Sequence, residues 1–167
     1  MDDWDDASGG DHEAEIDDFW QEACAAVGLS DAAVPAAWSF ADLPALADEL
    51  LGLVLDGTKT ATSSLRWYYD EGGETMPAVG DLSIVLDSTG RPRALIRTTE
   101  VDVTPFEEIS VEHAFREGEG DRTLAGWRLE HTRFWQRTMP DGETLSPATP
   151  IVCETFELLH PPASTPG

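Results

Sequence analysis

The sequence predicts an α+β fold in which antiparallel strands, open or closed into a barrel, are flanked by helices. Segments with helical periodicity are mixed with strand-like segments along the chain, and the strand-like segments come in hairpin-like pairs. A repeating strand–helix–strand series, which would indicate a parallel sheet, is not seen. The length of 167 residues suits one domain of about 100–200 residues, large enough to bury a core without disulfides.

The clearest helix is expected from about Asp42 to Gly57. Its apolar residues recur at the helical spacing of three and four positions. They form one continuous stripe of Leu43, Leu46, Ala47, Leu50, Leu51, Val54 and Leu55. An earlier helix with the same kind of spacing is expected to end at Gly28, in the position that favours glycine after a helix.

Two further helices are expected in the second half of the chain. Thr104–Glu107 has the pattern of a capping box with proline at the first helical position. Whether that helix continues to Phe115 or restarts with Ser110 as a second cap is left open. Asp121 is expected to cap the next helix. One face of that helix carries Leu124, Trp127, Arg128, His131, Phe134 and Trp135.

Strands are expected in the middle and at the end of the chain. Residues 82–87 are rich in strand formers, and residues 88–90 signal a turn. The chain then returns through residues 94–103. Residues 151–159 alternate between apolar and polar side chains, which predicts a final strand.

We expect a single domain over residues 14–159, with disordered tails at 1–13 and 160–167. The first tail is acidic and poor in apolar residues, and the second is rich in proline. The N-terminus lacks the basic and apolar regions of a secretory signal, and no apolar run approaches about 18 residues. These features predict a cytoplasmic protein without a membrane span. Cys24 and Cys153 are far apart and in no CxxC arrangement, so we expect two buried thiols.

The charge of the chain is strongly negative and uneven. The formal net charge is −23, residues 1–58 contain no lysine or arginine, and all ten bases fall within residues 59–137. A globally acidic protein repels polyanions and membrane surfaces, so an RNA partner would need a local cluster in the middle of the chain. The alternative is that the acidic surface serves solubility or a salty cytoplasm. DNA is not an expected partner.

Lys59 is the only lysine of the chain. Its ammonium group can act as a general base if burial lowers its pKa, or as a fixed positive charge. The alternative is that it neutralises the C-terminal end of a helix dipole. The hydroxyl groups of Thr60, Thr62, Ser63 and Ser64 are candidate nucleophiles that Lys59 could activate. Strand alternation places Lys59 and Thr62 on opposite faces unless the backbone bends, and such hydroxyl runs are also plain strand formers.

Acidic and imidazole groups follow in the second half of the chain. Glu117, Glu119 and Asp121 can orient a lysine, bind a cation or accept a proton, although their spacing is not that of a known metal loop. The alternative is a solvated turn with a helix cap. His131 lies in an apolar helical stripe beside Arg128, as either a core histidine or a functional group. Nothing in the sequence calls for a metal or an organic cofactor.

Other candidates remain ambiguous on residue chemistry alone. His113 and Arg97 can be structural or functional. Trp67, with Tyr68 and Tyr69 beside Arg66, can stack on a base or pack over the mouth of a barrel.

Together these segments resemble the ASCH domain family, in its larger bacterial branch, over about residues 38–159. Four stretches in this order carry the resemblance: Ala47–Leu50 leading into Gly57–Ser63; Gly80–Asp81 with Ile84–Ser88 and Gly90; Ile96–Val101 with Pro105–Phe106; and Glu117–Asp121 with Trp127, Arg128 and His131. The closing Val152–Phe156 fits as well.

The resemblance implies a PUA-like antiparallel β-barrel flanked by helices, with a cleft suited to RNA or a nucleobase. Members look like RNA-binding modules, and some look like hydrolases, either ribonucleases or amidohydrolases that remove the acyl group of N4-acetylcytidine. The G-x-K-x-x-T motif of the amidohydrolases falls on Lys59 and Thr62, and Glu117 or Glu119 completes the set. This chain is longer than those amidohydrolases and has an extra N-terminal helix.

Three hypotheses follow. In the first, the protein is a hydrolase that acts on RNA or a modified nucleoside. Thr62 attacks or activates water with help from Lys59, and Glu117 holds the lysine and relays a proton. Arg97 or backbone amides stabilise the oxyanion. In the second, the same cleft binds a base without catalysis. In the third, the acidic N-terminal third binds a protein. The expected substrate-binding residues are Ser63, Ser64, Arg66, Trp67, Arg97, Glu119, Arg128 and His131.

Overall fold

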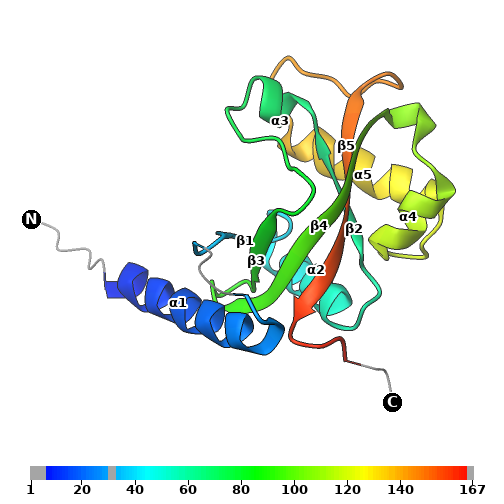
Figure 1. Cartoon of the computed structure of the whole chain (residues 1–167). Coiled ribbons are helices and arrows are strands. Elements are labelled where there is room, and N and C mark those ends of the chain that lie inside the picture. The colour runs from blue at the N-terminus through cyan, green and yellow to red at the C-terminus, as the bar shows by residue number, and fades with distance from the viewer. Residues whose placement is uncertain (1–6, 30–32, 165–167) are drawn as a thin grey trace, which may run out of the picture. The chain divides into compact units, whose positions relative to one another are not determined.

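The computed structural model describes residues 7–29 and 33–164 (Figure 1). In chain order its elements are α1 (Ala7–Val27), β1 (Ala36–Trp38), α2 (Pro44–Leu55), β2 (Ala61–Leu65), α3 (Trp67–Asp70), β3 (Leu82–Leu86), β4 (Pro92–Pro105), a 3₁₀ turn (Phe106–Glu108), α4 (Val111–Glu117), α5 (Leu124–Thr138) and β5 (Pro150–His160). The predicted α+β class, with strands flanked by helices, is confirmed.

The strands form a mixed sheet in the order β1-β3-β4-β5-β2. β3 pairs antiparallel with β4, and β2 pairs antiparallel with β5, as the hairpin-like spacing predicts. β1, by contrast, runs parallel to β3. The expectation of antiparallel strands alone is therefore corrected. Sequence reasoning missed β1 because a strand of 3 residues is too short to display alternation.

The chain divides into two compact units, and the long strands β4 and β5 run through both. Of the described residues, the first unit contains those up to Gly57, Leu82–Arg97 and those from Leu158 onward. The second unit contains Thr58–Asp81 and Thr98–Glu157. The single-domain expectation for residues 14–159 stays a prediction.

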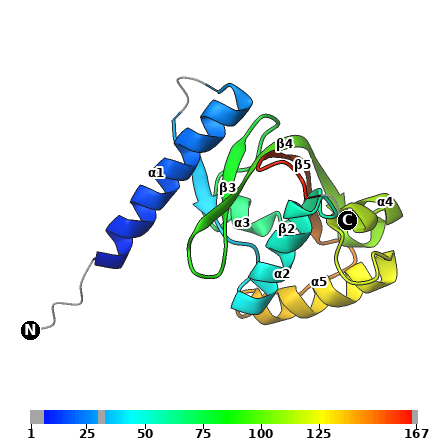
Figure 2. The same ribbon diagram turned by 90° about the horizontal axis from the view of Figure 1, so that it is seen from below.

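In the first unit, α1 packs on the sheet. Trp20 and Ala23 of this helix are buried against Ile84 of β3 and Leu95 of β4, and Figure 2 shows α1 running beside β3. The helix begins at Ala7, so the expectation of disorder is corrected for the residues after it, while residues 1–6 lie outside the described part. The acidic composition of this segment hid the helix, because few apolar residues mark its first turns.

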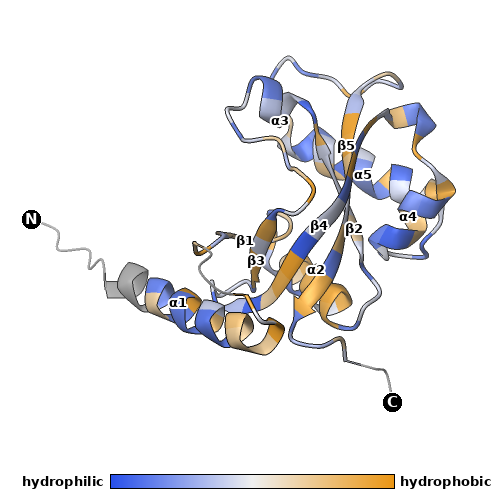
Figure 3. Cartoon of the chain, viewed as in Figure 1, coloured by the Kyte–Doolittle hydropathy of each residue, from blue (hydrophilic) through white to orange (hydrophobic). Residues whose placement is uncertain are grey.

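The predicted apolar helix is α2, which Figure 3 shows in hydrophobic colours over most of its length. Its buried residues are Ala47, Leu50, Leu51 and Val54. Gly57 follows with a φ of 86°, a conformation that suits glycine at the end of a helix. The C-terminal tail is attached to this helix, because the amide of Ser164 donates to the carbonyl oxygen of Leu55 at 2.9 Å. The expected disorder from residue 160 is therefore corrected up to Ser164, and residues 165–167 lie outside the described part.

In the second unit, α4 and α5 enclose a core of large side chains. The buried members are Leu65, Ile109, Ala114, Trp127, Trp135 and Ile151. Ser110 caps α4, so the helix restarts there after the 3₁₀ turn. Thr123 caps α5. Asp121, the expected cap, instead accepts hydrogen bonds from the amide and hydroxyl of Thr123 at 3.0 and 2.6 Å.

No helix within residues 7–29 and 33–164 combines the length and the apolar character needed to cross a lipid bilayer.

Candidate functional site

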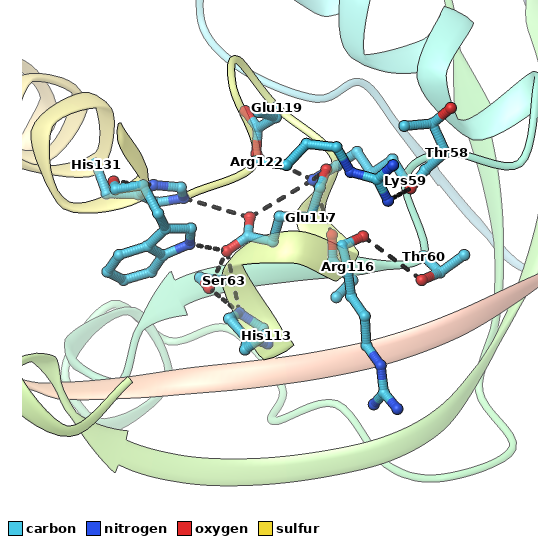
Figure 4. Close-up of polar contacts among 12 residues, drawn as sticks. Thr58, Lys59, Thr60, Ser63, His113, Arg116, Glu117, Glu119, Arg122 and His131 are labelled. Carbon is cyan, nitrogen blue, oxygen red and sulfur yellow. Dashed lines mark hydrogen bonds and ion pairs between the residues drawn. The ribbon is translucent and has the colours of Figure 1, made fainter. Parts of the chain in front are cut away.

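A cluster of polar side chains forms around one carboxylate in the second unit (Figure 4). Its members come from the segment before β2, from β2 itself, from α4 and the loop after it, and from α5. We call Lys59, Ser63, His113, Glu117, Glu119, Trp127 and His131 the Glu117 cluster. All of these residues fall within Thr58–Asp81 and Thr98–Glu157.

Lys59 is almost fully buried, with 2% of its surface exposed. Its Nζ donates to the carbonyl oxygen of Ala61 at 2.8 Å and lies 3.2 Å from Oε2 of Glu119. It also lies 3.5 Å from Oε1 of Glu117. A buried ammonium is costly unless it is paired and hydrogen-bonded. Lys59 is therefore not a freely solvated charge at a helix end.

Glu117 is the centre of the cluster and is buried at 1% exposure. Its Oε1 faces Lys59 and Nε2 of His131, at 3.5 and 3.3 Å. Its Oε2 accepts from Oγ of Ser63 at 2.7 Å, lies 3.0 Å from Nε2 of His113, and accepts from the indole N–H of Trp127. Five donors from four segments of the chain thus converge on one carboxylate.

These contacts set the ionisation of Glu117. Burial by itself would raise its pKa, but the positive charges of His131 and Lys59 and the imidazole hydrogen bonds outweigh burial. The pKa of Glu117 is therefore held well below its ordinary value. A carboxylate that stays ionised and is already occupied by donors is a poor proton acceptor, so its role in this geometry is to orient its partners.

Glu117 raises the pKa of both histidines of the cluster. Burial acts to lower the pKa of His113, but hydrogen bonds with Cys153 and Glu117 and the charge of Glu117 raise it to about 9. Burial acts in the same direction on His131, and the charge of Glu117 overcomes it, so its pKa is also raised. The ring of His131 stacks on Trp127 with centroids 4.2 Å apart, and its Nδ1 contacts the carbonyl oxygen of Trp127 at 2.8 Å.

The end of α4 brings a second carboxylate to Lys59. Gly118 has a φ of 73° and turns the chain out of the helix directly after Glu117. A Cβ atom there would lie 2.8 Å from the carbonyl oxygen of Thr58, so only glycine fits this approach. The next residue is Glu119, whose carboxylate reaches Lys59. Arg122 fastens the loop, because its guanidinium donates to the carbonyl oxygen of Phe115 at 3.1 Å.

Glu119 differs from Glu117 in ionisation and in access. Burial raises its pKa, and the nearby charge of Glu117 adds to this, while Lys59 opposes it. Its side chain is 25% exposed, against 1% for Glu117. A carboxyl group with a raised pKa and a path to solvent is a candidate general acid or base.

Two cavities lie next to the cluster. The first, which we call the Glu119 cavity, has a volume of about 260 Å³. It is lined by Ala114, Glu119, Gly120, Asp121, Gly126, Trp127, Leu129, Glu130 and His131. The second, the Cys153 cavity, has a volume of about 220 Å³. It is lined by Glu100, Asp102, Thr104, Glu108, Ile109, Ser110, Glu112, His113, Arg116, Cys153 and Thr155.

The structure brings together four of the residues singled out from the sequence, in addition to Lys59. Glu117, Glu119, Ser63 and His131 all belong to the cluster. Both Glu117 and Glu119 contact Lys59; the first is buried, and the second lines a cavity.

Thr62 is not part of this arrangement. Ser63 supplies the hydroxyl group that contacts Glu117, and side chains alternate along β2, so Thr62 points to the opposite face. In register, Thr62 lies opposite Glu154 of β5. No described contact joins Thr62 to Lys59, and the expected Lys59–Thr62 pairing stays a prediction.

The remaining sequence candidates lie elsewhere. Ser64 shares a 2.7 Å hydrogen bond with Tyr69, Arg66 pairs with Asp70, and Trp67 donates to Glu71. Arg128 donates to the carbonyl oxygen of Glu107 at 2.9 Å. Arg97 is exposed and belongs to the first unit. None of these side chains has a described contact with Lys59 or Glu117.

Sequence reasoning left His113 ambiguous and did not connect Trp127 or Cys153 with the site. A usable signal was present for His113, because it precedes Glu117 by four residues and thus faces the same side of a helix. The contribution of Trp127 depends on how α5 packs, which no local pattern reveals.

The cluster also contains potential ligands for a cation. Within the described residues, Glu117, Glu119 and His131 have ligand atoms that lie within 4.8 Å of one another. The ammonium of Lys59 lies against both carboxylates, at 3.5 and 3.2 Å. It supplies the positive charge that the two carboxylates require, so the geometry favours lysine over a bound metal as their partner.

Fold and site together define a class of protein: an α+β domain with a mixed sheet and a buried lysine–glutamate cluster between β2 and α4. The ASCH domain model matches residues 36–160, and the chain belongs to the ASCH domain family. Members of this family have a PUA-like fold of an RNA-binding type.

Two solved structures are similar over most of this chain. A DUF984 protein from Enterococcus faecalis is 34% identical, with a TM-score of 0.78, and the match covers 88% of this chain and 91% of that one. An ASCH domain from Lactobacillus crispatus is 28% identical, with a TM-score of 0.80, over 87% and 94% of the two chains. No curated protein matches the chain significantly.

Proposed function

We propose that the protein hydrolyses a modified nucleoside, of the N4-acylated cytidine type, in the Glu119 cavity. One observation carries this proposal: Glu119 lies 3.2 Å from the buried ammonium of Lys59, has a raised pKa, and lines a cavity of about 260 Å³. The cavity is slightly smaller than the range of about 300–1,000 Å³ typical of drug-sized ligands, which suits one nucleoside.

The proposed reaction is amide hydrolysis. The ionised carboxylate of Glu119 removes a proton from water as the water oxygen attacks the acyl carbon. The C–N bond then breaks, Glu119 returns the proton to the departing amine of the base, and a carboxylic acid is released. The positive charges of Lys59 and His131 favour the negative charge that develops on the acyl oxygen.

In this proposal Ser63 does not act as a nucleophile. Its hydroxyl group donates to Glu117, and the nearby ring of His113 is held in the protonated form, so neither group can remove the serine proton. Water activated by Glu119 replaces the attack by Thr62 that the family motif suggests.

The charges around the cavity favour a nucleoside over an RNA strand. Glu119, Asp121 and Glu130 all line it, and the whole chain carries a net charge of −23. Phosphate groups would be repelled by these carboxylates. A neutral base that stacks near Trp127 and His131 carries no such penalty.

A second function is supported by a different observation. Glu117 is saturated by five donors and Lys59 is almost fully buried, an arrangement that also suits a rigid scaffold for binding. A non-catalytic domain that holds a nucleobase or single-stranded RNA in the same cavity is therefore the alternative.

The test compares the wild type with Glu119→Gln and the control Glu130→Gln on N4-acetylcytidine and on a short single-stranded RNA. Both variants remove one carboxylate from the wall of the same cavity, but only Glu119 contacts Lys59. We expect Glu119→Gln to lower turnover of N4-acetylcytidine by about 100-fold or more, with little effect of Glu130→Gln. Lys59→Met should also abolish turnover while filling the space of the lysine.

Each other outcome decides between the proposals. Equal turnover by wild type and Glu119→Gln rejects the general base assigned here. Binding of either ligand without turnover supports the non-catalytic domain. If neither ligand binds or reacts, both proposals are rejected.

A further inference from the structure

A cysteine and a histidine line a second cavity. Cys153 of β5 lies directly opposite Ser63 of β2 in the antiparallel pair. Residues that are directly opposite in such a pair have their side chains on the same face of the sheet. His113 of α4 covers this face, because its Nε2 lies 2.7 Å from Oγ of Ser63.

Cys153 and His113 line the same cavity, and both are neighbours of Ser63. Nε2 of His113 also lies 3.0 Å from Oε2 of Glu117. A thiol attacks a disulfide as the thiolate. Both Cys153 and His113 line the Cys153 cavity of about 220 Å³, so the sulfur has space for a reagent.

The walls of this cavity carry an excess of negative charge. Its acidic residues are Glu100, Asp102, Glu108 and Glu112, and its arginine is Arg116. Arg116 is paired with Glu112 at 2.6 Å. A cationic reagent is attracted to such a surface, and an anionic reagent is repelled.

We propose that the Cys153 cavity is a thiol-modification site for small cationic disulfides, with Cys153 as the nucleophile and His113 as its positioning partner. In the reaction the sulfur of Cys153 attacks one sulfur of the disulfide, so that a new S–S bond forms and the original one breaks. The departing thiolate takes up the proton that Cys153 loses, and no further oxidant is needed. The site uses neither Lys59 nor Glu119 and is independent of the proposed hydrolase.

The first experiment measures charge selectivity in the Cys24→Ser variant, in which Cys153 is the remaining thiol of the chain. It is treated with two methanethiosulfonates that differ in charge, one carrying a trimethylammonium group and one a sulfonate group. Each transfers its thioalkyl group to the cysteine and releases methanesulfinate, and intact-protein mass gives the rate. We expect the ratio of the cationic to the anionic rate to exceed that of a blocked cysteine peptide by at least about tenfold.

A matched pair of variants tests the origin of that ratio. Glu100→Gln combined with Glu108→Gln removes two carboxylates from the cavity wall. The control combines Glu107→Gln with Glu143→Gln, which are exposed and do not line the cavity. We expect the ratio to fall at least about threefold in the first variant and to remain unchanged in the control.

His113→Asn tests the role of the imidazole. It should slow the labelling of Cys153 by the anionic reagent more than by the cationic one, because it also removes a positive charge from the cavity wall. Three results would overturn the proposal: labelling only after unfolding in urea, a rate ratio equal to that of the peptide, or equal changes in the two charge variants. The charge measurements remain decisive even if His113→Asn does not fold.

Discussion

Each of the two cavities described in the second unit is lined by one histidine that contacts Glu117. Oε1 of Glu117 faces His131 at 3.3 Å, which lines the Glu119 cavity. Oε2 faces His113 at 3.0 Å, which lines the Cys153 cavity. The carboxylate acts in the same way on both rings, since it raises the pKa of each.

The cavities differ in what stands beside the histidine. In the Glu119 cavity the neighbour is a carboxyl group with a raised pKa, itself in contact with Lys59. In the Cys153 cavity the neighbour is a thiol on β5. One central carboxylate can thus support proton transfer in one cavity and sulfur chemistry in the other. The comparison teaches that both histidines share one carboxylate, whereas the groups beside them differ, so the two proposed reactions depend on different residues.

The largest expected effect comes from removing the shared carboxylate. Glu117→Ala removes one of the two carboxylates that face the buried ammonium of Lys59 and the one carboxylate that His113 and His131 share. Breaking a buried ion pair on one side costs about 3–5 kcal/mol, and we expect a loss of this size in the free energy of unfolding measured in urea. The control Glu112→Ala, on the same helix but in an exposed pair with Arg116, should cost at most about 0.5 kcal/mol.

The contributions of Glu117 and His113 to the free energy of unfolding should be lost at opposite ends of the pH range. The lowered pKa of Glu117 gives stability that is present above its ordinary value of 4.5 and is lost as the pH falls below it. The raised pKa of His113 gives stability that is fully present below 6.5 and is lost as the pH rises towards about 9. The contributions of these two groups are therefore both complete between pH 4.5 and 6.5.

His113→Asn isolates the alkaline part of this profile. The variant should be less stable than the wild type near pH 6, by up to about 3 kcal/mol, because it lacks the charged ring. The two unfolding free energies should converge above about pH 9, where the wild-type ring has lost its proton. A constant difference at every pH would show that the imidazole contributes packing and not charge.

Alanine substitutions at the two glycines after α4 should test the turn that positions Glu119. Gly118 and Gly120 both have positive φ, at 73° and 58°, so alanine is strained at either position. A Cβ at Gly118 would lie 2.8 Å from the carbonyl oxygen of Thr58, whereas a Cβ at Gly120 meets nothing within 4 Å. We expect Gly120→Ala to cost about 1 kcal/mol and Gly118→Ala about 2 kcal/mol or more.

The two glycine variants also differ in their expected effect on the proposed reaction. Gly118→Ala should reduce turnover of N4-acetylcytidine, because the clash shifts the loop that holds Glu119 against Lys59. Labelling of Cys153 should be unaffected in both variants. Equal losses of stability and turnover in the two variants would show that the close approach to Thr58 has no role.

Periodicity and motif spacing predicted much of this molecule. The apolar stripe of α2 and the glycine after it predicted the helix that ends just before Lys59. Lys59 was a candidate because it is the only lysine of the chain. Glu117 and Glu119 followed from the resemblance to the ASCH family, which is confirmed. Local patterns of this kind involve residues that are close in sequence, so they can be recognised from the sequence alone.

The parts that escaped prediction depend on long-range pairing. Which face of β2 meets α4 decides between Thr62 and Ser63, and this register is set by packing against β5. The hydrogen bond between Trp127 and Glu117 joins two helices, and the contact between His113 and Ser63 joins a helix to a strand. No local sequence pattern predicts either contact. β1 is too short for its alternation to be recognised.

The smallest expected effects come from the helix caps, and they test whether the cavities respond separately. Ser110 caps α4, which carries His113, by accepting from the His113 amide at 3.0 Å. Thr123 caps α5, which carries His131, by accepting from the Gly126 amide at 3.0 Å. Ser110→Ala and Thr123→Ala should each cost about 1 kcal/mol. At this equal cost, Ser110→Ala should change the labelling rate of Cys153, and Thr123→Ala should change turnover in the Glu119 cavity. If each variant alters both readouts to the same extent, the two cavities form one coupled site, and the division of roles around Glu117 is wrong.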